Sequence, residues 1–185
     1  MLDSGFLKAF KQATEANWRV KSIDPAMYGF QFQQGTRWRP GLSNEGIEEF
    51  ETSLGVLFPV DFKAFLREMN GTDLPTLNVY GSCGEPHRYS VGVYSYPRDA
   101  EAVKQRIKDI DTSRTEIASD LAAQGFELLP EANLVPVFAH RYIVCSSNLD
   151  SSVVLSIIAH ATDAIVYANS LREYLEKEFL ESARS

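Results

Sequence analysis

Residues 41–73 carry the signals of two short helices joined by a tight connection, and this segment constrains the fold more than any other. Ser43 is a typical N-cap residue, and apolar side chains recur after it at helical spacing. Gly55 is expected to end the first helix, and Pro59 suits the first position of the second. We expect the Asn-Gly pair at 70–71 to close the second helix in the left-handed conformation. Its apolar stripe comprises Phe62, Phe65, Leu66 and Met69.

The order of these signals resembles the signature of the SUKH superfamily: an L-S start, a glutamate-rich helix, L-G-V-x-F-P, D-F-K-x-F-L and N-G. The C-terminal third resembles the strand, strand, strand, helix finish of that superfamily, in LVPVFAHRYIVC, SSVVLSI, DAIVYANSL and REYLEKEFL. The resemblance implies one SUKH-like domain over residues 1–185. The helix pair would lie at about 43–71 and the C-terminal strands and helix at about 134–181.

A chain of 185 residues is long enough for one domain with a substantial core, and 44% hydrophobic residues favour a packed globule. Consecutive strands with short turns predict antiparallel pairing, and helices before and after them must cover the sheet. The expected fold class is therefore α+β, a single domain with a mainly antiparallel sheet covered by helices. The strands are expected at 77–80, 88–96, 134–138, 141–145, 153–158 and 164–168.

The remaining helices are placed by caps and by apolar periodicity. A first helix is expected over residues 1–14, followed by extended segments over 18–39. Asp99 is predicted to cap a later helix, and the Ser170 and Glu173 pair matches a capping box for the last one. One buried core is expected to contain Phe50, Phe62, Phe65, Leu66, Val154, Ile157, Leu171 and Leu175.

The sequence gives no sign of export or of a membrane segment. Its N-terminus lacks a basic region followed by an apolar run, so it does not resemble a signal peptide. The longest purely apolar runs are far shorter than the ~20 residues needed to cross a bilayer. We expect a cytoplasmic protein with no membrane partner.

Candidate catalytic groups are few, since the chain has three histidines and two cysteines. Cys83 and His87 form a C-x3-H pair that lacks the second half of a zinc site. His140 and Cys145 lie five residues apart on one expected strand, which points them to opposite faces. We expect His140 to bond a backbone carbonyl and Cys145 to be a buried free thiol. No nucleotide-binding, zinc-protease or esterase motif occurs, so we expect no enzyme activity, cofactor or metal.

Charge is distributed unevenly along the chain. Residues 41–73 contain seven acidic and two basic side chains, a net charge of −5, whereas residues 1–40 carry +3. We expect the acidic side chains of the first signature helix to lie on a solvated face, opposite its apolar stripe; these are Glu45, Glu48, Glu49 and Glu51. Such a surface repels phosphate and attracts basic proteins, so nucleic acid binding is disfavoured.

The SUKH superfamily includes many bacterial immunity proteins and a fungal regulator of cell-wall synthesis. The resemblance therefore implies a noncatalytic protein-binding domain, and first an immunity protein that neutralises a cognate, possibly basic, toxin by occluding it. A regulatory or scaffold protein with an endogenous partner is the alternative, and an undetected enzyme is less favoured. The expected protein-binding residues are Glu45, Glu48, Glu49, Asp73, Tyr80 and Tyr94.

Overall fold

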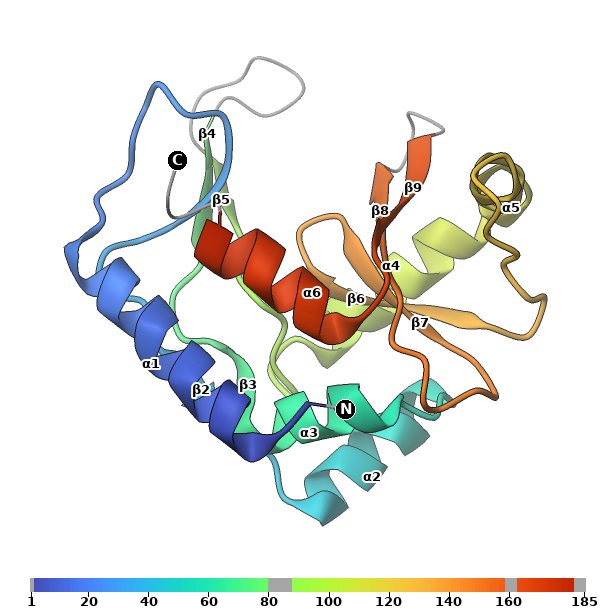
Figure 1. Cartoon of the computed structure of the whole chain (residues 1–185), viewed down its shortest axis with the longest axis horizontal. Coiled ribbons are helices and arrows are strands. Elements are labelled where there is room, and N and C mark those ends of the chain that lie inside the picture. Colours follow the sequence, from blue (N-terminus) through green and yellow to red (C-terminus); the bar gives the residue numbers. More distant parts are fainter. Residues whose placement is uncertain (1, 80–87, 159–162, 182–185) are drawn as a thin grey trace.

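A four-stranded antiparallel sheet, in the order β6-β7-β8-β9, forms the centre of the computed structural model, which describes residues 2–79, 88–158 and 163–181. Two smaller antiparallel sheets, β1-β4-β5 and β2-β3, lie beside it (Figure 1). The strands are β1 Gly29–Phe32, β2 Trp38–Pro40, β3 Met69–Thr72, β4 Thr76–Val79, β5 Arg88–Ser90, β6 Asn133–Phe138, β7 Arg141–Cys145, β8 Val154–Ile158 and β9 Asp163–Ala168. The expected α+β class is confirmed.

Helices cover both faces of the central sheet (Figure 1). They are α1 Ser4–Val20, α2 Asn44–Leu54, α3 Val60–Glu68, α4 Ala100–Asp111, α5 Arg114–Ala122 and α6 Leu171–Leu175, which continues as the π-helical turn η1 Glu176–Glu181. Within the described ranges, no helix is long and apolar enough to cross a membrane.

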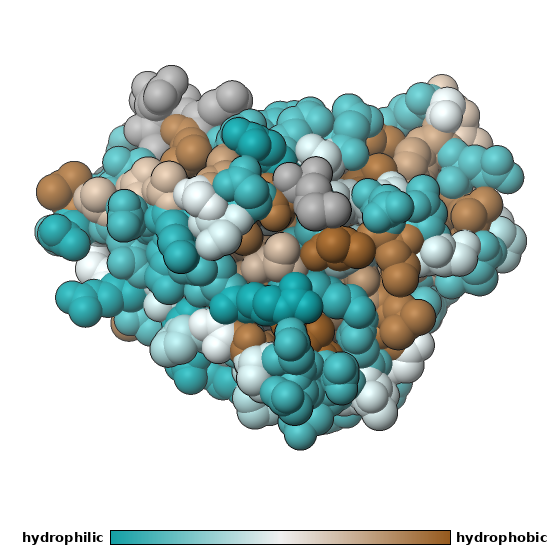
Figure 2. Space-filling view, turned by 60° about the horizontal axis from the view of Figure 1, so that its bottom comes forward, coloured by the Kyte–Doolittle hydropathy of each residue, from teal (hydrophilic) through white to brown (hydrophobic). Residues whose placement is uncertain are grey.

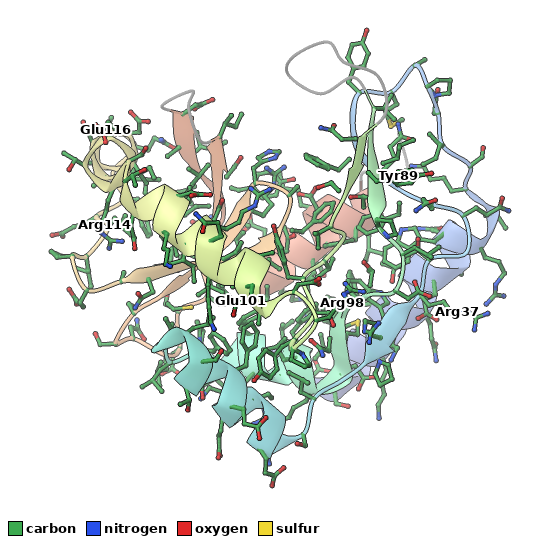
Figure 3. The ribbon with its side chains drawn as sticks, turned by 180° about the vertical axis from the view of Figure 1, so that it is seen from behind. Arg37, Tyr89, Arg98, Glu101, Arg114 and Glu116 are labelled. Carbon is green, nitrogen blue, oxygen red and sulfur yellow. The ribbon has the colours of Figure 1, made fainter. Side chains whose placement is uncertain are left out.

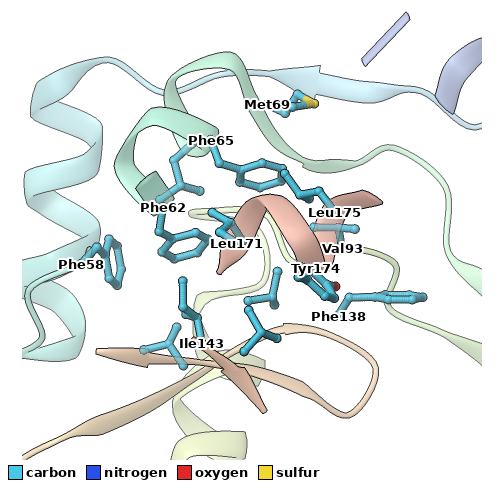
Figure 4. Close-up of a cluster of buried hydrophobic side chains, with 14 of the residues drawn as sticks. Phe58, Phe62, Phe65, Met69, Val93, Phe138, Ile143, Leu171, Tyr174 and Leu175 are labelled. Carbon is cyan, nitrogen blue, oxygen red and sulfur yellow. The ribbon is translucent and has the colours of Figure 1, made fainter. Parts of the chain in front are cut away.

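The pleat of the central sheet divides the hydrophobic core into two clusters. Val154 on β8 faces the cluster shared with α1, α2, α3 and α6, part of which appears in Figure 4. Leu155 and Ile157 point to the opposite face, where α4 and α5 pack. All eight predicted core residues are buried. The prediction of one shared core is wrong for Ile157, because three positions along a strand separate it from Val154.

The expected helix pair is confirmed, but its second helix ends earlier than predicted. α3 stops at Glu68, and Met69 begins β3, where it pairs with Pro40. Gly71 does have a positive φ of 74°, as expected, yet it lies within a strand. A Cβ atom there would come within 2.6 Å of the carbonyl oxygens of Val93 and Tyr94. Close contact with that segment, rather than a helix end, therefore requires the glycine.

Two further boundaries differ from expectation. α1 continues to Val20, so Trp18 is helical rather than extended; its ring packs 4.5 Å from that of Phe32 and 5.3 Å from that of Trp38. The strand expected over 88–96 is limited to Arg88–Ser90. After Ser90 the chain leaves β4 and contacts β3 instead. There the backbone N–H of Thr72 donates a hydrogen bond to the carbonyl of Val93.

Candidate functional site

Helix α2 presents a row of carboxylates to solvent because its ends and its inner face are fixed. The Ser43 hydroxyl accepts a hydrogen bond from the backbone N–H of Gly46, and Gly55 ends the helix at a φ of 67°. Ile47 and Phe50 are buried on the inner face. The carboxylates at positions 45, 48 and 49 are therefore exposed, and none of the three forms an ion pair with another described residue.

A first groove, of about 530 Å³, runs along this helix beside Tyr96. Glu45, Glu48 and Glu49 line it together with Tyr96. The Tyr96 ring stacks on Phe50, with 4.7 Å between ring centroids and 13° between ring planes. This wall is held in place independently of any partner.

Asn70 anchors the Tyr96 backbone from the neighbouring strand β3. Its side-chain amide donates to the Tyr96 carbonyl at 2.6 Å, and its side-chain oxygen accepts from the Tyr96 N–H at 2.9 Å. The expectation that Asn70 caps α3 is therefore wrong, because its side chain bridges two segments 26 residues apart in sequence.

A second groove, of about 510 Å³, borders the end of α2. Glu48 lines both grooves, and Leu57 lines the second with 63% of its surface exposed. An exposed leucine lies here beside carboxylates that form no ion pair with another described residue. Protein interfaces usually combine an apolar centre with a polar rim, and Leu57 and the carboxylates could supply these two parts. The face that bears α2 and α3 comes forward in Figure 2, where hydrophobic groups lie among hydrophilic ones.

Glu51 does not belong to this solvated row, contrary to expectation. Only 7% of it is exposed, and its carboxylate accepts from the Phe58 backbone N–H at 2.6 Å and pairs with the Lys63 ammonium at 2.7 Å. This carboxylate holds the connection between α2 and α3 in place. A buried backbone N–H needs such an acceptor, and helical periodicity alone could not reveal it.

The family described as SMI1 / KNR4 family (SUKH-1) matches residues 41–177, which is more than half of the chain. The chain belongs to the SMI1/KNR4 family. A search of curated proteins gave no match.

Of the other predicted interface residues of this SMI1/KNR4 member, Asp73 and Tyr94 line neither groove. Asp73 is exposed, and its carboxylate accepts from the backbone N–H groups of Arg37 and Leu74, both at 2.8 Å. Asp73 thus orders the β2–β3 junction and lines neither groove. Tyr80 lies outside the described residues, as do Cys83, His87 and His160.

Tyr94 is half-buried, so only part of its side chain can contact a partner. Burial raises the pKa of the Tyr94 hydroxyl, which also forms a hydrogen bond with Arg106. Sequence reasoning missed Tyr96 and Leu57, the two side chains that accompany the carboxylates. A tyrosine before a proline and an isolated leucine after a helix end gave no signal that pointed to a groove.

The described part of this SMI1/KNR4 protein contains no group of three or more His, Cys, Asp or Glu side chains placed to hold a metal ion. Cys145 is buried, and burial, followed by the charge of Glu51, raises the pKa of its thiol well above the usual range. A thiol that stays protonated is a poor nucleophile. His140 lies in the β6–β7 turn rather than on a strand, and its ring nitrogens make no hydrogen bond to other described residues, contrary to expectation.

The pKa of His140 is lowered from 6.5 to about 4, mainly by burial and further by the charges of Arg141 and Arg106. Above pH 6.5 neither the folded nor the unfolded state protonates this ring. Between pH 6.5 and about 4 the unfolded state binds a proton that the folded state does not bind. The free energy of unfolding therefore decreases as the pH is lowered through this range. We expect His140→Gln to reduce this fall, as measured by urea unfolding at pH 7 and pH 4.5. If the free energy of unfolding decreases by the same amount between pH 7 and pH 4.5 in the wild type and in His140→Gln, this pH dependence does not come from His140.

Proposed function

We propose that this protein is a noncatalytic binding protein that neutralises a cognate toxin by covering its functional surface. Family membership supports a SUKH-type role, and many SUKH proteins are immunity proteins. The observation that carries the proposal is the row of unpaired carboxylates Glu45, Glu48 and Glu49 around grooves bordered by Tyr96 and Leu57.

The chemistry of this row favours a basic protein as the partner. The pKa of Glu45 is lowered by hydrogen bonds from its own backbone N–H and from Ser43, so its carboxylate is charged at neutral pH. Unpaired carboxylates steer a cationic partner toward the surface and repel nucleic acid phosphate. Tyr96 belongs to a residue type that is enriched at interface hot spots and supplies the anchor after encounter, and Leu57 adds exposed apolar surface in the second groove.

The experiment begins with affinity purification of the tagged protein from its native cells and mass spectrometry of what it retains. A bound toxin is then expressed in a test strain with and without this protein. We expect wild-type protein to restore growth and the double variant Glu48→Lys/Glu49→Lys to fail to do so, although it folds normally. Capture of an endogenous enzyme or structural protein, with no toxin retained, would contradict the immunity role.

A matched control tests whether the position of the charges matters. Glu116 on α5 and Glu127 in the following loop are both exposed and line neither groove. Figure 3 shows Glu116 at the opposite end of the molecule from α2. Glu116→Lys/Glu127→Lys changes the net charge by the same amount and should still restore growth. Equal loss of protection in both double variants would show that overall charge matters, rather than the α2 face.

A further inference from the structure

A cavity of about 280 Å³ lies between the end of α1, strand β1, the β6–β7 turn and η1, and it shares no lining residue with the two grooves beside α2. Its walls include Trp18, Phe30, Phe32, Phe138 and Phe179. This volume is at the lower end of the range for small-molecule sites, which is roughly 300–1,000 Å³. It therefore suits a ligand of one or two rings and excludes a nucleotide or a folded peptide element.

The aromatic walls are fixed by packing against one another. The Phe32 ring stacks on Phe138 at 5.1 Å and on Trp18 at 4.5 Å, and Phe30 meets Phe138 edge-on at 6.0 Å. Phe30 and Phe32 are only partly buried, so they retain surface toward the cavity. A preformed aromatic wall binds a flat aromatic ring without a large ordering cost.

The polar side of the cavity is positively charged in a protein whose net charge is −7. Arg141 donates to the Glu178 carboxylate at 2.9 Å and lies over the Tyr167 ring at 3.8 Å, so this pair is internally balanced. Lys21 lines the cavity and forms no ion pair or side-chain hydrogen bond with another described residue. The excess positive charge therefore comes from Lys21.

His140 adds a neutral polar group to the same wall. Burial, and then the charges of Arg141 and Arg106, lower the pKa of its ring, so the imidazole is neutral at neutral pH. An uncharged imidazole has one N–H donor and one acceptor. A ligand with a negative group would meet an N–H donor on His140 and the ammonium of Lys21 on the same cavity wall.

We propose that this cavity binds a small aromatic carboxylate, with its ring against Phe30 and Phe32 and its carboxylate toward Lys21 and His140. An uncharged aromatic would gain no attraction from the Lys21 ammonium, and an aromatic cation would be repelled by it. The cavity shares no residue with the carboxylate row on α2. The ligand proposal and the toxin-binding proposal can therefore be tested independently.

Indole-3-acetate is a suitable probe, and indole is its matched uncharged counterpart. Isothermal titration of the full-length protein gives the Kd of each, and amide NMR shifts at Gly29 and Ala139 report where they bind. We expect indole-3-acetate to bind more tightly than indole and to shift both amides. Absence of saturable shifts with either probe up to about 10 mM would overturn the proposal.

Three variants separate the charge from the cavity. Lys21→Gln should raise the Kd of indole-3-acetate about tenfold, the loss of one charge-assisted contact, and leave indole unchanged. Lys8→Gln, an exposed site on α1, the helix that Lys21 follows, should change neither Kd. Asn17→Trp fills the cavity from α1 and should abolish binding of both probes in a protein with normal thermal unfolding.

Two results would contradict the assignment even if binding is seen. One is equal weakening by Lys21→Gln and Lys8→Gln, which would show nonspecific attraction. The other is unchanged binding in Asn17→Trp, which would place the probe elsewhere. Glu48→Lys/Glu49→Lys should bind the probe as wild type does, whatever its effect on a protein partner.

Discussion

Replacing Phe65 with alanine is expected to lower the free energy of unfolding by about 3–5 kcal/mol, the usual cost of removing a buried aromatic ring. Phe65 is 2% exposed and lies where α3 meets α1 and β2. Its ring meets Trp38 edge-on at 5.8 Å and stacks on Phe62 at 6.2 Å. Urea unfolding followed by circular dichroism measures the loss.

Leu57→Ala is the matched control, because it also removes a large apolar side chain but from a surface that is 63% exposed. It should change the free energy of unfolding by no more than about 0.5 kcal/mol. A folded Phe65→Ala variant with wild-type stability would show that the packing of the helix pair against the core is misassigned.

Glu178→Leu is expected to cost about 3 kcal/mol, because it leaves the charge of Arg141 without its carboxylate in a largely desolvated position. The Arg141 and Glu178 side chains are 12% and 17% exposed. Arg141 would keep its bond to the Ser156 hydroxyl at 2.9 Å and its contact with the Tyr167 ring. Neither contact neutralises the guanidinium.

The double variant Arg141→Met/Glu178→Leu distinguishes an uncompensated charge from a simple loss of packing. Replacing both members of a buried pair with apolar side chains is often close to neutral. We therefore expect the double variant to be more stable than Glu178→Leu in the same urea titration. If the losses in free energy of unfolding measured for Glu178→Leu and for Arg141→Met add in the double variant, the two side chains are not energetically coupled, contrary to what their geometry indicates.

The sequence predicted the helix pair and the four strands β6 to β9 because their signals are local. The Ser43 cap, the left-handed Gly55 and the Ser170 cap all function as expected, and the Ser170 hydroxyl accepts from the Glu173 N–H at 3.2 Å. Caps and apolar periodicity depend on a few neighbouring residues, so they can be read without knowledge of the fold.

The errors came from residues whose roles depend on contacts outside their own helix. Met69 continues the apolar stripe of α3, but pairing with Pro40 makes it the start of a strand. Glu51 lies among other glutamates, but its carboxylate is buried and accepts a hydrogen bond from the backbone N–H of Phe58. Neither contact has a signature in a single sequence, since each depends on where a second segment lies in space.

The candidate site was predictable only in part for the same reason. The carboxylates of α2 follow from one helix, but Tyr96 reaches them from a segment more than 40 residues away. The aromatic cavity combines residues near 18, 30, 140 and 179, and no local pattern joins them. A site assembled from four separate segments cannot be located without the fold.

The measurement that tests the central claim most directly is the association rate of this protein with its captured partner as a function of salt concentration. We expect Glu48→Lys/Glu49→Lys to slow association about tenfold at low salt and to weaken its salt dependence, whereas Glu116→Lys/Glu127→Lys has little effect. The same association rate for wild-type protein and Glu48→Lys/Glu49→Lys at low salt would contradict a partner surface on α2.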